Sequence, residues 1–168
     1  MSRLDLDDYL PYLLNRAGAR IAEAFGRETR KHGISLQMWR VLAALQQEDG
    51  QTVGSLARRT SIDISTLSRL LDQMQKKRLL LRRRDAQDQR SIAIHRTAAA
   101  QDITGKLVPI ARTYEAKALS GFAPAEARTL KAALRRLYAN LDALEDAGIP
   151  AKKDRAAAAA RSKAKAAF

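Results

Sequence analysis

The stretch from Leu56 to Thr97 constrains the fold of this chain more than any other part of it. Its sequence, LARRTSIDISTLSRLLDQMQKKRLLLRRRDAQDQRSIAIHRT, holds a short helical pattern, a turn, a longer helical pattern and two β-compatible runs around a charged loop. Thr52 and Asp63 stand where side-chain N-caps of two helices are expected. The runs after the second helix predict a β-hairpin, which we expect to pack against the helices because an isolated hairpin is marginally stable.

The longer helix, predicted over 64–77, separates an apolar face from a polar one. Ile64, Leu67, Leu70 or Leu71, and Met74 are expected to point inward. The opposite face begins with short hydrogen-bonding side chains and one arginine, where an ordinary exposed helix carries long charged pairs. Such a face suits a helix whose N-terminal half approaches base edges and phosphates in the major groove of duplex DNA. The candidate DNA-binding residues on it are Ser65, Thr66, Ser68, Arg69 and Gln73.

Basic charge is concentrated in the same part of the chain. Residues 52–96 carry 11 Lys/Arg against 4 Asp/Glu, and residues 150–168 carry 6 against 1, whereas the rest is nearly neutral. Of the formal net charge of +13, +7 falls on the first segment and +5 on the second. Localised basic charge is typical of phosphate binding through counterion release. The alternative, a merely solvated charged face, accounts less well for this concentration.

The predicted hairpin over 79–96 carries three consecutive arginines. In its second strand Ile92 and Ile94 are expected to face inward, and Ala93 and His95 outward, where His95 has no expected role. The arginines could belong to a solvated turn, but their place directly after the polar helix favours a DNA-contacting loop. The candidate contacts here are Arg82, Arg83 and Arg84.

Apolar residues at helical spacing predict further helices on both sides of this segment, over about 8–31 and 98–147. In the last helix, leucines step by 4, 3, 4 and 3 residues, a heptad-like pattern that needs a partner surface. The chain's own helices could supply it, but pairing with a second copy is favoured because dimers are the commonest closed assembly. The candidate dimerisation residues are Leu10, Leu13, Leu130, Leu134, Leu137, Leu141 and Leu144.

Composition excludes several other functions. The 168 residues include no cysteine and two histidines, so thiol redox chemistry is excluded, and we expect no metal site and no cofactor. No glycine-rich phosphate loop, G-x-S-x-G or H-E-x-x-H occurs, and we expect no catalytic residues and no enzyme. The acidic start differs from a secretory signal and no stretch approaches about 18 apolar residues, which predicts a cytoplasmic protein that does not bind membranes.

These features together resemble the MarR family of bacterial winged-helix transcriptional regulators. The resemblance covers residues 8–146, and its most specific part is R-R-R-D-A-Q-D-Q-R, with Asp88 and Arg90 in the family's D-x-R position. It implies that Arg90 enters the narrow, electronegative minor groove and is fixed there by Asp88. The sequence differs from the family pattern at two places that affect the angle of the wing, the hairpin over 79–96. Arg78 replaces the glycine that usually follows the recognition helix, which is predicted over 64–77. RTAAA, ending at Ala100, stands where L-T-x-x-G is usual.

The resemblance implies a mainly α fold with a small β-hairpin wing. A winged helix-turn-helix lobe over about 36–97 is flanked by dimerisation helices over about 8–31 and 98–147. Residues 1–149 would then form one domain. Residues 150–168 are a basic Ala/Lys/Arg-rich tail, which either binds DNA non-specifically or only aids solubility.

The resemblance also implies a small anionic effector, bound between the dimer helices and the DNA-binding lobe. The segments YLPYLLNRAG and WRVLAAL look similar to members that respond to aromatic acids or their coenzyme A thioesters. Arg16 and Arg20, four residues apart, could clamp a carboxylate or phosphate, although pairing with acids such as Glu23 or contact with solvent is equally expected. Trp39 is expected to pack in the core, with one wall of a ligand pocket as the alternative. The candidate effector-binding residues are Tyr9, Tyr12, Arg16, Arg20, Trp39 and Arg40.

The sequence thus predicts a ligand-responsive, sequence-specific DNA-binding regulator, which we expect to be a homodimeric repressor released from an inverted-repeat operator by an anionic effector. The alternative is a nucleoid-type architectural protein that binds DNA without sequence preference through its basic tail. A third possibility, a winged-helix lobe that serves protein assembly, conflicts with the polar face over 64–77.

Overall fold

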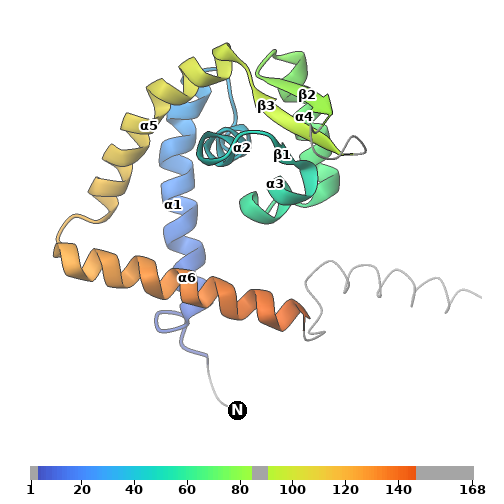
Figure 1. Ribbon diagram of the computed structural model, residues 1–168. Helices are drawn as coiled ribbons and strands as arrows, with labels where there is room; N and C mark the ends of the chain where they lie inside the picture. The colour runs from blue at the N-terminus through green and yellow to red at the C-terminus, as the bar shows by residue number, and fades with distance from the viewer. Residues whose placement is uncertain (1–3, 85–90, 147–168) are drawn as a thin grey trace, which may run out of the picture. The chain divides into compact units, whose positions relative to one another are not determined.

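The computed structural model describes residues 4–84 and 91–146, and the chain divides into two compact units at Ala118 and Leu119. Six helices and three strands are found in the described part (Figure 1). The first unit contains α1 (Leu10–Lys31), α2 (Leu36–Gln47), β1 (Gln51–Thr52), α3 (Val53–Thr60), α4 (Ile64–Lys76), β2 (Leu80–Arg84), β3 (Ile92–Arg96) and α5 (Ala98–Ala118). The second contains α6 (Pro124–Asp146).

Side-chain caps fix the starts of α2, α3 and α4. Ser35, Thr52 and Asp63 each accept a hydrogen bond from the backbone N–H three residues further on, at 3.2, 3.2 and 3.0 Å. Each bond satisfies an N–H that has no partner inside its own helix. The caps that the sequence predicts for α3 and α4 are therefore confirmed, and these two helices begin where expected.

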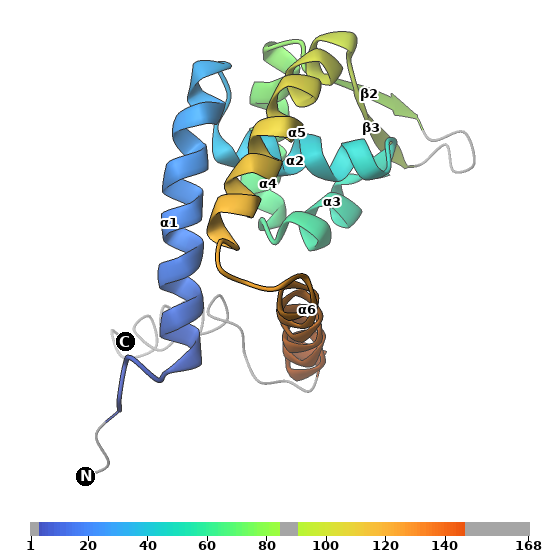
Figure 2. The ribbon, with the colours of Figure 1, turned by 90° about the vertical axis from the view of Figure 1, so that its left-hand side faces the viewer.

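In the first unit, α2 packs against α1, α3, α4, α5 and β3 and so lies at the centre of the core (Figure 2). The predicted inward residues Leu67, Leu70, Leu71 and Met74 of α4 are buried. Ile64 is not: it is 60% exposed, because it is the first residue of α4 and lies beyond the edge of the core. The side chains that are fully buried include Leu42, Leu45, Leu56, Leu67, Leu71, Met74 and Leu107.

The three strands form an antiparallel sheet in the order β1-β3-β2. The predicted hairpin is β2 and β3, but the two-residue strand β1, too short to leave a periodic pattern, was not expected. The prediction that Ile92 points inward is wrong. Ile92 pairs with Arg84 at the outer end of the sheet, and it is 51% exposed. Ala93 is buried rather than outward, because β3 is the central strand and neighbours cover this small side chain.

The two residues that replace expected glycines lie in the turn between α4 and β2, for Arg78, and in the first turn of α5, for Ala100. Arg78 adopts the left-handed conformation, with φ 57°, and the next N–H, of Leu79, donates to the Met74 carbonyl at 2.9 Å. This bond is typical of a helix end that favours glycine. The Thr97 hydroxyl donates to the Arg78 carbonyl at 2.8 Å and accepts from the Ala100 N–H at 3.2 Å, so it also caps α5. Ala100 is buried in the first turn of that helix.

These elements confirm the predicted fold class, mainly α with a small β-sheet wing. No helix within residues 4–84 and 91–146 combines the length and apolar character needed to cross a membrane.

Candidate nucleic-acid interface

The outer face of α4 carries the polar residues that the sequence assigns to DNA. Arg69 and Gln73 lie one helical turn apart and are exposed, while Leu70, Leu71 and Met74 bury the other side of the helix. Within the described residues, the side chains of Arg69 and Gln73 make no hydrogen bond or ion pair. Both side chains are therefore available to donors and acceptors outside the protein.

The two hydroxyls at the start of α4 are already engaged. Ser65 donates to Asp63 Oδ1 at 2.5 Å and Thr66 donates to Asp63 Oδ2 at 2.6 Å. Each hydroxyl keeps acceptor lone pairs but has its one proton committed. In this arrangement Ser65 and Thr66 can accept from a base amino group, whereas a phosphate, which only accepts, must first break the bond to Asp63.

The arginines of β2 lie next to α4. Arg82 Nη2 is 2.6 Å from Asp72 Oδ1, and this ion pair joins the outer face of α4 to the wing. Arg83 and Arg84 continue the strand and are exposed. Two adjacent elements thus present basic side chains together, which the sequence predicts. The expected wing-tip residues, Asp88 and Arg90, lie outside the described part of the chain.

The base of the wing is held by a carboxylate that sequence reasoning missed. Asp49, between α2 and β1, accepts from the Arg96 backbone N–H at 3.0 Å and lies 2.9 Å from His95 Nδ1. Burial acts to raise the pKa of Asp49, but the Arg96 N–H and the His95 ring outweigh it, so the pKa lies below its ordinary value. His95, expected to have no role, therefore helps to anchor β3. The pairing of β3 with β1, which the sequence does not show, places Asp49 close to His95 and Arg96.

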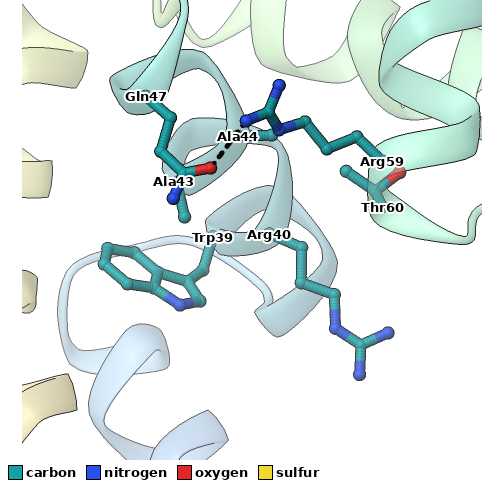
Figure 3. A pocket seen from close by; sticks show the side chains of 7 residues that line it. All are labelled: Trp39, Arg40, Ala43, Ala44, Gln47, Arg59 and Thr60. Carbon is teal, nitrogen blue, oxygen red and sulfur yellow. Dashed lines mark hydrogen bonds between the residues drawn. The ribbon is translucent and has the colours of Figure 1, made fainter. Parts of the chain in front are cut away.

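A pocket of about 360 Å³ lies between α2 and α3 (Figure 3). Trp39 and Arg40, both predicted effector residues, line it. Arg59 reaches from α3 towards Gln47 and donates to its side chain at 2.8 Å; it also pairs with Glu48 at 3.0 Å. The lining residues are Trp39, Arg40, Ala43, Ala44, Gln47, Arg59 and Thr60.

The other predicted effector residues lie elsewhere. Tyr9 precedes α1, and Tyr12, Arg16 and Arg20 lie in its first half; none of the four lines the pocket. The Arg16 guanidinium lies over the Tyr12 ring, 5.4 Å from its centroid. The sequence left two roles open for Trp39, packing in the core or forming one wall of a pocket. Its side chain lines the pocket, and its ring also packs edge-on against Phe25, with ring centroids 5.3 Å apart.

Five of the seven predicted dimerisation residues are exposed within their own units. In α1, Leu10 and Leu13 are 50% and 41% exposed, while the residues that α1 buries begin only at Phe25. In α6, Leu130, Leu134 and Leu141 are exposed and Leu137 is half-buried; the side chain of Leu144 lies outside the described part. The two apolar faces therefore meet the first requirement of an interface, which is accessibility.

A helix pair, α3 and α4, followed by a β-sheet wing, with a polar outer face on the second helix and arginines on the wing, defines a winged helix-turn-helix DNA-binding protein. The model of the MarR family matches residues 34–92, from the residue before the α2 cap to the start of β3. The chain belongs to the MarR family and is a DNA-binding transcriptional regulator, not an enzyme.

Known proteins agree with this assignment. A MarR-family regulator from Silicibacter pomeroyi, solved by crystallography, is 32% identical with a TM-score of 0.74, over 83% of this chain and 96% of that one. The regulator SarZ of Staphylococcus epidermidis is 26% identical over 64% of this chain and 73% of SarZ. BpsR of Bordetella bronchiseptica, whose DNA binding is regulated by 6-hydroxynicotinic acid, has a TM-score of 0.73 over 82% of this chain and 98% of BpsR. At 21% identity, the likeness to BpsR concerns the fold alone.

Proposed function

We propose that this chain acts in the cytoplasm as a homodimeric repressor, released from an inverted-repeat operator by a small anionic effector, an aromatic acid or an acyl-coenzyme A. The observation that carries the proposal is the polar face of α4 beside the arginines of β2, joined by the Asp72–Arg82 ion pair. Base-reading side chains and phosphate-binding side chains are thus presented by two adjacent elements. Sequence-specific recognition needs both kinds of contact.

In this proposal, Arg69 and Gln73 contact base edges in the major groove, because both are exposed on α4 and without a partner in the described residues. Arg83 and Arg84 contact the phosphate backbone beside the groove. Arg90, with Asp88, is proposed for the minor groove on the family resemblance. The roles are separable, since loss of a base contact relaxes specificity, whereas loss of a phosphate contact weakens binding to all sequences.

A dimer is proposed because the leucines of α1 and α6 are exposed at helical spacing. A two-fold axis through such an interface presents two copies of α4, matching half-sites about one helical turn, roughly 34 Å, apart. An operator with inverted-repeat symmetry then binds both lobes at once. Random duplex lacks that match and retains mainly the electrostatic part of the affinity.

Ligand response is proposed from the pocket beside α3 and from the regulation of BpsR, a protein of the same fold, by an aromatic acid. A ligand shifts a conformational equilibrium only by its differential affinity for the two states. The effector must therefore bind more tightly to a dimer whose lobes are at the wrong spacing for the operator than to the dimer on DNA.

The test is selection of duplexes from a random pool, followed by titration of the selected site and of random duplex at about 150 mM salt. Enrichment of an inverted repeat, and a loss on the order of 1 to 3 kcal/mol in operator binding for Arg90→Ala, are expected. No preference for any sequence would contradict the proposal. Deletion of residues 150–168 should leave discrimination almost unchanged, whereas an architectural protein that depends on its basic tail would lose most of its affinity.

A further inference from the structure

Both hydroxyls and one backbone N–H at the start of α4 donate hydrogen bonds to Asp63, the residue that caps this helix. The Thr66 N–H and the Ser65 hydroxyl donate to Oδ1, at 3.0 and 2.5 Å, and the Thr66 hydroxyl donates to Oδ2 at 2.6 Å. A cap needs only one oxygen, which accepts from the backbone. The second oxygen of Asp63 therefore does something that capping does not require: it holds the proton of the Thr66 hydroxyl.

This arrangement decides what the two hydroxyls can offer to DNA. A hydroxyl has one proton to donate and two lone pairs that accept. Because both protons are directed to the carboxylate, Ser65 and Thr66, which are exposed, present acceptors outward. The negative charge of Asp63 acts in the same sense, since it repels phosphates and the keto oxygens of bases. The start of α4 is therefore a surface that fits hydrogen-bond donors.

The base edges in the major groove of duplex DNA carry two kinds of donor, the 6-amino group of adenine and the 4-amino group of cytosine. Guanine and thymine present keto oxygens, which accept. Every base pair thus joins one amino base to one keto base. The strand that carries the amino base distinguishes A·T from T·A and C·G from G·C. An acceptor placed against one strand reads this difference without distinguishing adenine from cytosine.

We propose that Asp63 determines the base preference of α4 by holding the protons of Ser65 and Thr66, so that the base facing Thr66 in each half-site is adenine or cytosine. This role of Asp63 rests on the sequence-specific DNA binding proposed above and deepens it. Arg69, one turn further along α4, is exposed and suits guanine, whose N7 and O6 accept from a guanidinium. Because a helix rises about 1.5 Å per residue, the two side chains lie about one to two base pairs apart along the groove.

Asp63→Asn reverses one of these hydrogen bonds and retains the cap. Asparagine caps helices about as well as aspartate. Its carbonyl oxygen is required at the Oδ1 position, where the Thr66 N–H donates, so the amide NH2 faces the Thr66 hydroxyl. The hydroxyl then accepts from this amide, and its own proton is free to point outward. Thr66 changes from an acceptor into a donor, which favours a keto base.

Duplexes are selected from a random pool with the full-length protein and its variants, and the affinities of the selected sites are measured at about 150 mM salt. Thr66→Val removes the hydroxyl and locates the base pair that Thr66 reads, as the pair whose preference is lost. At this pair the parent should bind adenine or cytosine about three- to tenfold more tightly than guanine or thymine, as expected for one hydrogen bond. Asp63→Asn should lose or invert this preference. Asp72→Asn, which removes a charge from the outer face of the same helix, should retain it.

Base analogues test the same contact without a change at Asp63. Purine in place of the preferred adenine, or 2-pyrimidinone in place of cytosine, removes only the amino group of the base. The parent should lose about three- to tenfold in affinity, whereas Thr66→Val should lose nothing further, because the group that accepted from the amine is already absent. An equal loss in both proteins would mean that another side chain reads the amino group, and would overturn the assignment to Thr66. This comparison decides the matter even if Asp63→Asn does not fold.

The role of Asp63 and the proposed function can fail separately. If the parent selects an inverted repeat but prefers guanine or thymine at the Thr66 pair, or if Asp63→Asn keeps the preference for adenine or cytosine, the role of Asp63 is wrong and the operator proposal stands. The same holds if Thr66→Val leaves the preference unchanged at every pair. If the parent selects no sequence, the proposed function is contradicted, and the role of Asp63 with it.

Discussion

Arg82 Nη2 lies 2.6 Å from Asp72 Oδ1, and this contact joins the outer face of the recognition helix α4 to the first strand of the wing. Asp72 is 55% exposed and Arg82 is 35% exposed, so the pair adds little to the stability of the fold. Its consequence is conformational: one arginine is held at the junction of α4 and β2 before DNA arrives. Holding a long side chain in advance reduces the ordering entropy that binding must overcome.

Asp72→Asn should therefore reduce sequence discrimination. Loss of a negative charge facing DNA should strengthen binding to random duplex about two- to threefold, whereas the operator should gain less or lose affinity because Arg82 is no longer held. Fluorescence anisotropy with both duplexes measures the ratio. Asp102→Asn on α5, where the carboxylate pairs with Lys106, is the matched charge control. Equal strengthening on both duplexes would show that Asp72 acts through charge alone.

Arg78→Gly should stabilise the protein. A side chain at φ 57° carries a steric cost that glycine lacks, and glycine is the residue usual at such a helix end. We expect a gain of about 1 kcal/mol in the free energy of unfolding by urea, reduced somewhat by the greater freedom of glycine in the unfolded chain. Arg78→Ala removes the same charge and keeps the strain, so it should show no gain. Equal stability of the two variants would contradict this account.

The sequence predicts the elements that follow from local patterns. The caps at Thr52 and Asp63 and the buried face of α4 are confirmed because a cap needs only the next three residues and a helix face repeats at fixed spacing. Ile64 and Ala93 were placed wrongly because the same periodicity does not say where the core ends or what covers a central strand.

The candidate sites show the same limit. The polar face of α4 and the arginines of β2 could be predicted because they are contiguous in sequence. Asp49 and Arg59 could not, because each acts on residues brought close by tertiary packing: Asp49 across the β1–β3 pairing, and Arg59 across the α2–α3 contact. Neither has a local pattern that distinguishes it from an ordinary surface charge.

Asp49→Asn should destabilise the base of the wing at neutral pH and not in acid. The pKa of Asp49 is lower in the folded protein than its ordinary value of 3.8, so the ionised carboxylate favours folding above that pH, and its contribution is lost as the pH falls through the lower, folded value. Because the side chain is 40% exposed, we expect a loss of about 1 kcal/mol at pH 7. Urea unfolding of both proteins at pH 7, 5 and 3 measures this difference. If the difference in the free energy of unfolding between the two proteins stays constant down to pH 3, the charge of Asp49 does not contribute to stability.

Leu134→Asp should disrupt the proposed dimer. Leu134 is 40% exposed on α6, in the row of leucines with Leu130 and Leu141, and a carboxylate buried there without a partner is strongly unfavourable. Sedimentation equilibrium should show the mass of one chain for the variant and of two for the parent at the same concentration, with operator affinity falling towards that of random duplex. Ala132→Asp places the same charge on the opposite, exposed side of α6 and should remain dimeric. If Leu134→Asp stays dimeric, or if the parent itself has the mass of one chain, α6 is not the dimer interface, and paired recognition of an inverted repeat needs another surface.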